Sequence, residues 1–252
     1  MSFKGKFVWY ELMTTDIPAA EKFYSQVVGW IAKDAQMPGM KYTIVHAGEI
    51  PVGGIMSVPM PNMPSSWIGY IAVDDVDAEA AAVKKDGGVI HKEPTDIPNV
   101  GRFAVVGDPT GAGFCLFKGN MDAPPSLAPN ALGAVGWHEL HAGDGAKAWE
   151  FYAKHFGWIK DSAMDMGAMG VYQLFKTGGD QAMGGMMTKA PQMPVSGWLY
   201  YFNVDSAAAA AERVTKAGGK IANGPMEVPG GQWIVQCFDP QGAMFAVVSA
   251  GK

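Results

Sequence analysis

Two glutamates stand in matching sequence surroundings and are the residues best suited to acid–base chemistry. Glu11 lies in the run Trp-Tyr-Glu-Leu, and Glu139 lies in the run Trp-His-Glu-Leu. A carboxylate held among apolar groups can take a proton from a ligand or hold the ligand by a hydrogen bond. The structural alternative is that each glutamate anchors a neighbouring part of the backbone, a role that a duplication would also preserve.

The residues around each glutamate predict a strand with one functional face. Residues two apart in a strand point the same way, so Glu11 shares a face with Trp9. By the same rule Glu139 shares a face with Trp137 and His141. A third alternative is a metal ion held by Glu139 and His141, although two ligands on one strand are too few for a tight site.

Five other residues are weighed as ligand contacts or packed side chains. Trp67 and Trp198 open later strands and could stack on a planar ligand. Cys115 could be a reactive thiol, but a single strand cysteine is more often a small buried hydrophobe. His138 alternates to the face opposite Glu139, which predicts a packed or interfacial side chain, and His155 lies in a helix and is expected to be exposed.

The whole chain repeats itself, which places these residues in two equivalent settings. Early landmarks recur after 128 residues (139 − 11), and later ones after 131 (239 − 108). The later pairs are Gly53-Gly54 with Gly184-Gly185, Trp67 with Trp198, and Asp108-Pro109 with Asp239-Pro240. Such a pattern indicates two homologous domains, and the second has about three extra residues in the segment that corresponds to Trp30–Gly53 of the first. The paired glycines predict a bulge or a close approach of the backbone.

Each repeat predicts two units of one strand, one helix and further strands. Asp16 can cap the first helix, Pro18 lies in its first turn, and Gly29 ends it. For the second helix, Asp74-Asp75 is the expected cap and Gly87-Gly88 the expected end. The strands predicted in the first repeat are 7–13, 42–46, 52–58, 67–73, 89–92, 103–107 and 113–117.

The amino-acid composition argues against some classes of partner for this chain. The chain has 252 residues, 48 % of them hydrophobic and 17 % charged, with a net charge of −5 and no basic run. Nucleic acid and membrane surfaces are therefore not expected as partners. The two cysteines form no evident disulfide framework, which favours the cytoplasm. We expect a domain over 1–118, a linker over 119–133 and a domain over 134–252, in a monomer or homodimer that binds a small-molecule ligand.

The order of these units resembles a known superfamily. The Phe-Tyr pair near the end of the first helix and the Asp-Pro-x-Gly turn before the last strand occur in both repeats. This arrangement resembles the vicinal oxygen chelate superfamily, which includes glyoxalase I, extradiol dioxygenases and bleomycin resistance proteins. The Trp-x-Glu-Leu and Gly-Gly patterns most resemble its two-domain glyoxalase-like "hydroxylase" group. The resemblance implies an α+β fold of tandem domains, each a curved, mainly antiparallel cup-shaped sheet with its helices outside.

The resemblance also implies where metal ligands would lie, and this chain departs from that pattern. Those positions fall on Trp9, Ile68 and Cys115 in the first repeat, and on Trp137, Leu199 and Ala246 in the second. None is His, Asp or Glu, and a divalent metal needs several such ligands. We expect no cofactor, with a divalent metal as the open alternative. The function is then either an enzyme, a lyase, isomerase or oxygenase, or a metal-free module that sequesters a small apolar molecule.

Overall fold

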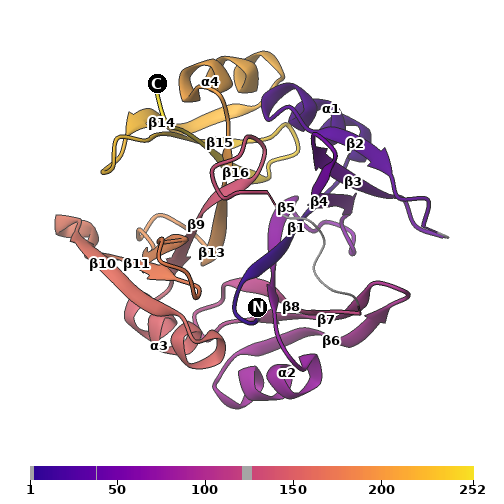
Figure 1. The fold of residues 1–252 in the computed structure, drawn as a ribbon, viewed down its shortest axis with the longest axis vertical. Coiled ribbons are helices and arrows are strands. Elements are labelled where there is room, and N and C mark those ends of the chain that lie inside the picture. The colour runs from indigo at the N-terminus through magenta and orange to yellow at the C-terminus, as the bar shows by residue number, and fades with distance from the viewer. Residues whose placement is uncertain (1–2, 38, 121–126) are drawn as a thin grey trace. The chain divides into compact units, whose positions relative to one another are not determined.

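The computed structural model describes residues 3–37, 39–120 and 127–252, and it confirms the α+β fold with its repeated strand–helix–strands order (Figure 1). The first repeat runs β1 (Phe7–Thr14), α1 (Ile17–Val27), β2 (Ile31–Asp34), β3 (Tyr42–Ala47), β4 (Ile50–Ser57), β5 (Ser66–Ala72), α2 (Val76–Lys85), β6 (Val89–Ile97), β7 (Gly101–Gly107) and β8 (Gly113–Gly119). The second runs β9 (Val135–Ala142), α3 (Gly145–Phe156), β10 (Ile159–Asp165), the 3₁₀ helix η1 (Gly167–Met169), β11 (Val171–Lys176), β12 (Gly184–Thr188), β13 (Gly197–Asn203), α4 (Ala207–Lys216), β14 (Lys220–Glu227), β15 (Trp233–Phe238) and β16 (Met244–Ser249).

Each repeat forms one open, mixed sheet of eight strands. The strand order is β2-β3-β4-β1-β5-β8-β7-β6 in the first repeat and β10-β11-β12-β9-β13-β16-β15-β14 in the second. Within every βαβββ module the first strand pairs in parallel with the last, and the remaining pairs are antiparallel. Sequence analysis missed β2, because all four of its residues are exposed and show no alternation.

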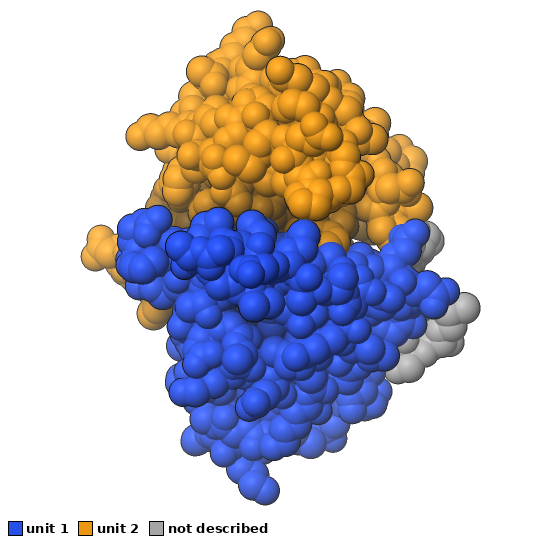
Figure 2. Space-filling model, turned by 90° about the vertical axis from the view of Figure 1, so that its left-hand side faces the viewer, with its two compact units in different colours: residues 1–8, 68–124, 138–198 blue, residues 9–67, 125–137, 199–252 orange. Residues whose placement is uncertain are grey.

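Contacts along the chain define two compact units that cut across the repeats (Figure 2). Unit 1 contains residues 1–8, 68–124 and 138–198, and unit 2 contains residues 9–67, 125–137 and 199–252. Each unit therefore combines one βαβββ module from each repeat. The domain boundaries predicted above refer to the repeats and stay a prediction. Residues 121–126 of the predicted linker lie outside the described residues.

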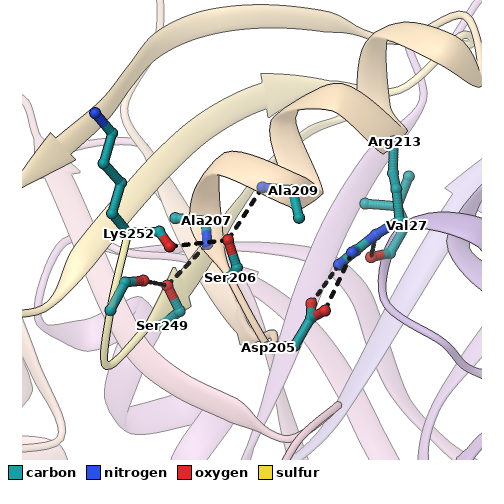
Figure 3. Close-up of polar contacts among 9 residues, drawn as sticks. Val27, Asp205, Ser206, Ala207, Ala209, Arg213, Ser249 and Lys252 are labelled. Atoms are coloured by element: carbon teal, nitrogen blue, oxygen red, sulfur yellow. Dashed lines mark hydrogen bonds and ion pairs between the residues drawn. The ribbon is translucent and has the colours of Figure 1, made fainter.

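Polar side chains cap the four helices and fix where they begin. Asp16 accepts a hydrogen bond from the third residue beyond it at 3.1 Å, as predicted, and Asp75 does the same at 2.9 Å. Asp144 caps α3 and Ser206 caps α4 (Figure 3). These contacts satisfy backbone N–H groups that have no partner within the first turn. In the described ranges of the chain, no helix has both the length and the apolar character to cross a lipid bilayer.

A buried Trp–Tyr–Asp network connects helix α1 to a distant turn in unit 2. The hydroxyl of Tyr24 donates to Asp239 Oδ2 at 3.1 Å and accepts from Trp67 Nε1 at 2.8 Å. The other carboxylate oxygen of Asp239 accepts from the backbone N–H groups of Gln241 and Ala243, which closes the Asp-Pro turn. Burial raises the pKa of Asp239, and it raises that of Tyr24 well above its ordinary value.

The same network occurs in unit 1. Tyr152 donates to Asp108 Oδ2 at 3.1 Å and accepts from Trp198 Nε1 at 3.0 Å. Asp108 again closes its own turn by accepting from Thr110 and Ala112. In both units the tyrosine of one repeat contacts the aspartate of the other repeat. The two motifs that carried the family resemblance are therefore partners in the core, so their repetition reflects folding.

The repeats differ in the hairpin that follows the first helix, where the extra residues were predicted. Strand β10 is longer than β2, contains a bulge between Lys160 and Ala163, and is followed by η1. Leu174 pairs with Gly185 where Ile44 pairs with Gly54. The offsets are 130 (174 − 44) and 131 (185 − 54), so two extra residues lie in the β10–β11 hairpin and one in the β11–β12 turn.

Candidate functional site

The glutamate of the second repeat is the centre of a polar cluster in unit 1. Tyr172 donates its hydroxyl hydrogen to Glu139 Oε2 at 3.0 Å, and His141 Nε2 lies 2.8 Å from Glu139 Oε1. The side chains of Glu139 and His141 are only 13 % and 14 % exposed. The structure thus brings together two residues selected from sequence and adds Tyr172, which sequence analysis did not select.

The paired glycines explain how Tyr172 reaches Glu139. Strand β9 runs parallel to β12, with Glu139 opposite Gly185. A Cβ atom on Gly185 would collide with the Tyr172 ring, and one on Gly184 would collide with the carbonyl oxygen of His138. Glycine at these positions lets the tyrosine ring lie across the strand and place its hydroxyl on the carboxylate. The predicted close approach is confirmed, and the Gly-Gly pair was the sequence signal for this tyrosine.

In unit 2 the first repeat has the same arrangement of glutamate, glycine and tyrosine, but with different polar groups around it. Glu11 is buried at 8 % exposure and lies opposite Gly54, and a Cβ atom on Gly54 would collide with the Tyr42 hydroxyl. That hydroxyl accepts a hydrogen bond from Trp9 Nε1 at 3.0 Å. Met13 stands at the position equivalent to His141 (141 − 128). The first site therefore contains a buried carboxylate and a tyrosine but lacks the imidazole.

Three other predicted contact residues are buried. Trp67 and Trp198 lie in the cores of their units and donate their indole N–H groups to Tyr24 and Tyr152, which favours a packing role. Cys115 is fully buried opposite Tyr70 in the register of β5 and β8. Stacking by the tryptophans and reactivity of the thiol stay predictions.

Trp137 belongs to an apolar cluster of unit 2. It is partly buried and packs against four buried side chains, Leu199, Tyr201, Ala246 and Val248. Two of the positions where the superfamily would place metal ligands, Leu199 and Ala246, are therefore part of a hydrophobic cluster.

His138 is packed as predicted. It is almost completely buried, its Nδ1 lies 2.8 Å from the carbonyl oxygen of Met183, and its ring stacks on Phe7 with centroids 4.3 Å apart. Burial lowers the pKa of His138 to about 4, because the charged imidazolium loses its hydration. The residue is therefore a neutral core side chain at neutral pH.

The expectation that His155 is exposed is wrong. Its side chain is 3 % exposed, with Nδ1 2.6 Å from Glu79 Oε1 and Nε2 3.0 Å from Asp86 Oδ2. The carboxylates of α2 supply partners that let a histidine of α3 be buried. Helical position alone could not reveal this, because the partners come from another helix, in the other repeat.

In the parts of the chain that the structure describes, no three His, Cys, Asp or Glu side chains gather as they would around a metal ion. Glu139 and His141 are in contact, but two residues are fewer than the three ligands that such a group needs. The predicted residues Glu139 and His141 form, with Tyr172, a polar cluster that can hold a ligand by hydrogen bonds or move a proton.

Comparisons with known proteins agree with this architecture. Residues 6–116 and 134–247 each match the model of the Glyoxalase/Bleomycin resistance protein/Dioxygenase superfamily. A protein of Mycobacterium tuberculosis, CFP32, named provisionally as a glyoxylase, is 35 % identical over 95 % of this chain and 93 % of its own length. The anthracycline biosynthesis protein DnrV of Streptomyces peucetius is 30 % identical over 97 % of this chain and 93 % of its own length.

Solved structures with low sequence identity share the fold. A Mn(II)-bound glyoxalase from Novosphingobium aromaticivorans aligns with a TM-score of 0.68 at 17 % identity, over all of this chain and 84 % of that one. The 2,3-dioxygenase LapB from Pseudomonas sp. KL28 aligns with a TM-score of 0.69 at 12 % identity, over all of this chain and 94 % of that one. Together with the two family matches, one for each repeat, these findings show that the chain belongs to the glyoxalase/bleomycin resistance protein/dioxygenase superfamily.

Proposed function

We propose that this chain binds small organic molecules at two sites, one built on Glu11 and one on Glu139, without a divalent metal. The observation that carries the proposal is the cluster in which Tyr172 and His141 engage both oxygens of Glu139. An ionised carboxylate offers about four lone-pair directions, so Glu139 can also accept from a ligand hydroxyl or N–H. The names of the relatives, which refer to a glyoxylase, a dioxygenase and anthracycline biosynthesis, all concern small organic molecules.

The donor set of this chain does not fit the metal of the superfamily. The six positions that the resemblance assigns to ligands hold tryptophan, aliphatic or cysteine side chains, and none holds His, Asp or Glu. Tight zinc, manganese and iron sites use several converging His or carboxylate ligands. Glu139 and His141 are paired with each other, and two ligands from one strand fall short of that number.

Binding without chemistry is the second candidate, and the first repeat favours it. Glu11 is buried and Tyr42 lies near it across Gly54, but Met13 replaces the imidazole. A thioether cannot exchange protons. A site of this composition can recognise a ligand through its carboxylate and phenol while leaving the ligand unchanged.

A titration with a defined probe tests the proposal. We suggest 1-hydroxyanthraquinone, a planar hydroxylated aromatic compound, followed by quenching of tryptophan fluorescence in protein purified without a metal-affinity tag. Binding is expected to survive chelator and to weaken about tenfold to a hundredfold in Glu139→Gln, since a hydrogen bond to a charged group contributes about 1.5–3 kcal/mol. The exposed Glu150→Gln is the matched control. Near-stoichiometric metal in the purified protein, with binding lost on chelation, would overturn the proposal.

A further inference from the structure

The two proposed sites differ in one residue that decides what each can do. We infer that His141 is the group that exchanges a proton with the ligand in the second repeat, that Glu139 is its positioning residue, and that the first repeat binds without proton transfer. This inference rests on the proposed function and reverses the sequence-based assignment of Glu139 as the catalytic group. Its support is the contact of His141 Nε2 with Glu139 Oε1 at 2.8 Å.

The 2.8 Å contact between His141 Nε2 and Glu139 Oε1 indicates where the imidazole carries a hydrogen. An ionised carboxylate can only accept, so the hydrogen between the two groups is carried by His141 Nε2. A neutral imidazole with its hydrogen on Nε2 has a lone pair on Nδ1. The contact with Glu139 uses Nε2, so Nδ1 lies outside this pair. The carboxylate thus orients the ring and leaves Nδ1 as the proton acceptor, which is the arrangement of carboxylate–histidine pairs in hydrolases with the roles of the two ring nitrogens exchanged.

The neighbours of Glu139 hold it in the orientation that this role needs. Tyr172 donates to Oε2, which prevents the carboxylate from turning away from His141. The tyrosine can do so because Gly185 has no side chain, and strand pairing sets Gly185 directly opposite Glu139. Both side chains of the pair are largely shielded from water, which strengthens the interaction between them.

The chemistry suits an enolisable carbonyl compound. The O–H bond of the enol, or a C–H bond next to the carbonyl, breaks and its hydrogen forms an N–H bond with His141 Nδ1. The electron pair stays on the ligand as an enolate, and the imidazolium is stabilised by the Glu139 carboxylate. Return of the same proton to the alternative atom completes a keto–enol isomerisation. No oxidant, reductant or second substrate is needed.

The first repeat cannot perform this step with the equivalent residues. Met13 occupies the position of His141 and has no titratable nitrogen. Trp9 donates its indole N–H to the Tyr42 hydroxyl, a contact that positions the phenol but offers no base. Proton exchange is therefore expected from one site per chain, and ligand binding from two.

The first measurement is direct and needs no ligand. Two-dimensional ¹H–¹⁵N NMR of the histidine rings, assigned with His141→Gln, reports which nitrogen carries the hydrogen. We expect His141 to be mainly in the Nε2–H form in the wild-type protein. In Glu139→Gln this form should no longer predominate. A dominant Nδ1–H form in the wild-type protein, or a tautomer unaffected by Glu139→Gln, would overturn it.

The second measurement uses 2-tetralone, a small aromatic ketone that enolises, in deuterium oxide. Incorporation of deuterium next to the carbonyl is followed by NMR, and binding is followed by fluorescence. His141→Gln should lower the catalysed exchange about a hundredfold or more and change the binding constant less than threefold. Glu139→Gln should also lower the catalysed exchange, because the imidazolium loses its stabilising charge, and Glu139→Asp, which keeps that charge, should restore part of it. A purely structural role would give no such rescue.

The outcomes separate the two proposals. Binding with exchange unchanged in His141→Gln would overturn this inference and leave the proposed function standing. Binding that disappears on chelation would overturn the proposed function, while the histidine tautomer would still decide the role of Glu139. Equal loss of exchange in Met13→Leu and His141→Gln would show that the first repeat participates and would also contradict the inference.

Discussion

Unit 1 and unit 2 are assembled from the same kinds of module, yet their helix pairs are joined by different groups. In unit 2, Arg213 of α4 donates from Nε to the carbonyl oxygen of Val27, in the last turn of α1, at 3.2 Å (Figure 3). Its Nη2 also lies 2.7 Å from Asp205 Oδ1. The guanidinium keeps its charge at any pH a protein tolerates, so this contact depends on pH only through its acceptor.

In unit 1 the residue equivalent to Val27 is His155 (155 − 128), and it is buried against α2. Its two nitrogens face Glu79 and Asp86, and Lys154 lies 2.7 Å from Asp86 as well. This histidine–carboxylate contact and the contact of His141 with Glu139 both lie in unit 1. The comparison shows that duplication preserved the Trp–Tyr–Asp network in both units, while other polar groups of the two units diverged.

Substitutions in the Trp–Tyr–Asp network are expected to lower the free energy of unfolding most, and by equal amounts in the two units. Tyr152→Phe leaves the Asp108 carboxylate and the Trp198 N–H without the hydroxyl that joins them, and Tyr24→Phe does the same in unit 2. Each should lower the free energy of unfolding by about 2–4 kcal/mol, since buried polar groups are left unpaired. Urea denaturation measures this loss. An effect confined to one unit would show that the two networks are not equivalent.

The glycines that face the two tyrosines should give the next largest effects. Gly185→Ala forces its new methyl group into the Tyr172 ring, and Gly54→Ala does so with the Tyr42 hydroxyl. Overpacking of this kind costs about 1–3 kcal/mol. Gly197→Ala is the matched control, because a methyl group there meets open space. If Gly185→Ala left both stability and 1-hydroxyanthraquinone binding at the wild-type values, the glycine would not be what positions Tyr172.

His155→Val introduces into unit 1 the residue that unit 2 has at this place. The loss of the hydrogen bond to Glu79 should destabilise the protein by about 1–2 kcal/mol at neutral pH. Lys154, and with it His155, holds the pKa of Asp86 below its usual range. A depressed folded pKa stabilises the protein above the unfolded value and ceases to do so as pH falls through the folded value.

The difference in free energy of unfolding between wild type and His155→Val should therefore shrink below about pH 4, where Asp86 becomes protonated. Thermal unfolding followed from pH 3 to pH 7 measures it. Arg213→Ala is the comparison in unit 2, where Arg213 holds the pKa of Asp205 below its ordinary value in the same way. A difference that stays constant across this range would show that His155 acts through packing rather than charge.

Many of the helices and strands could be predicted from the sequence, because the signals that specify them are local. Asp16 and Asp75 were identifiable as caps, and alternation located most strands. The site was harder, because Tyr172 is 33 residues from Glu139 and only the strand register brings them together. Local sequence around the histidine of α3 likewise gave no sign of its carboxylate partners in the other repeat.

Met13→His is expected to have the smallest effect on stability and the most specific effect on the comparison. It gives the first repeat the imidazole that the second repeat has, two residues from the buried Glu11. Met13 is only partly buried, so we expect a change in the free energy of unfolding below about 1 kcal/mol. If the strand and the glycine–tyrosine contact suffice to position the new histidine against Glu11, it should adopt the Nε2–H form and should roughly double the exchange of 2-tetralone. Restoration of exchange by Met13→His in a His141→Gln background would show the same result without interference from the second site. A new histidine with its hydrogen on Nδ1, or one that adds no exchange, would show that Tyr172 and the longer β10–β11 hairpin contribute something the first repeat lacks.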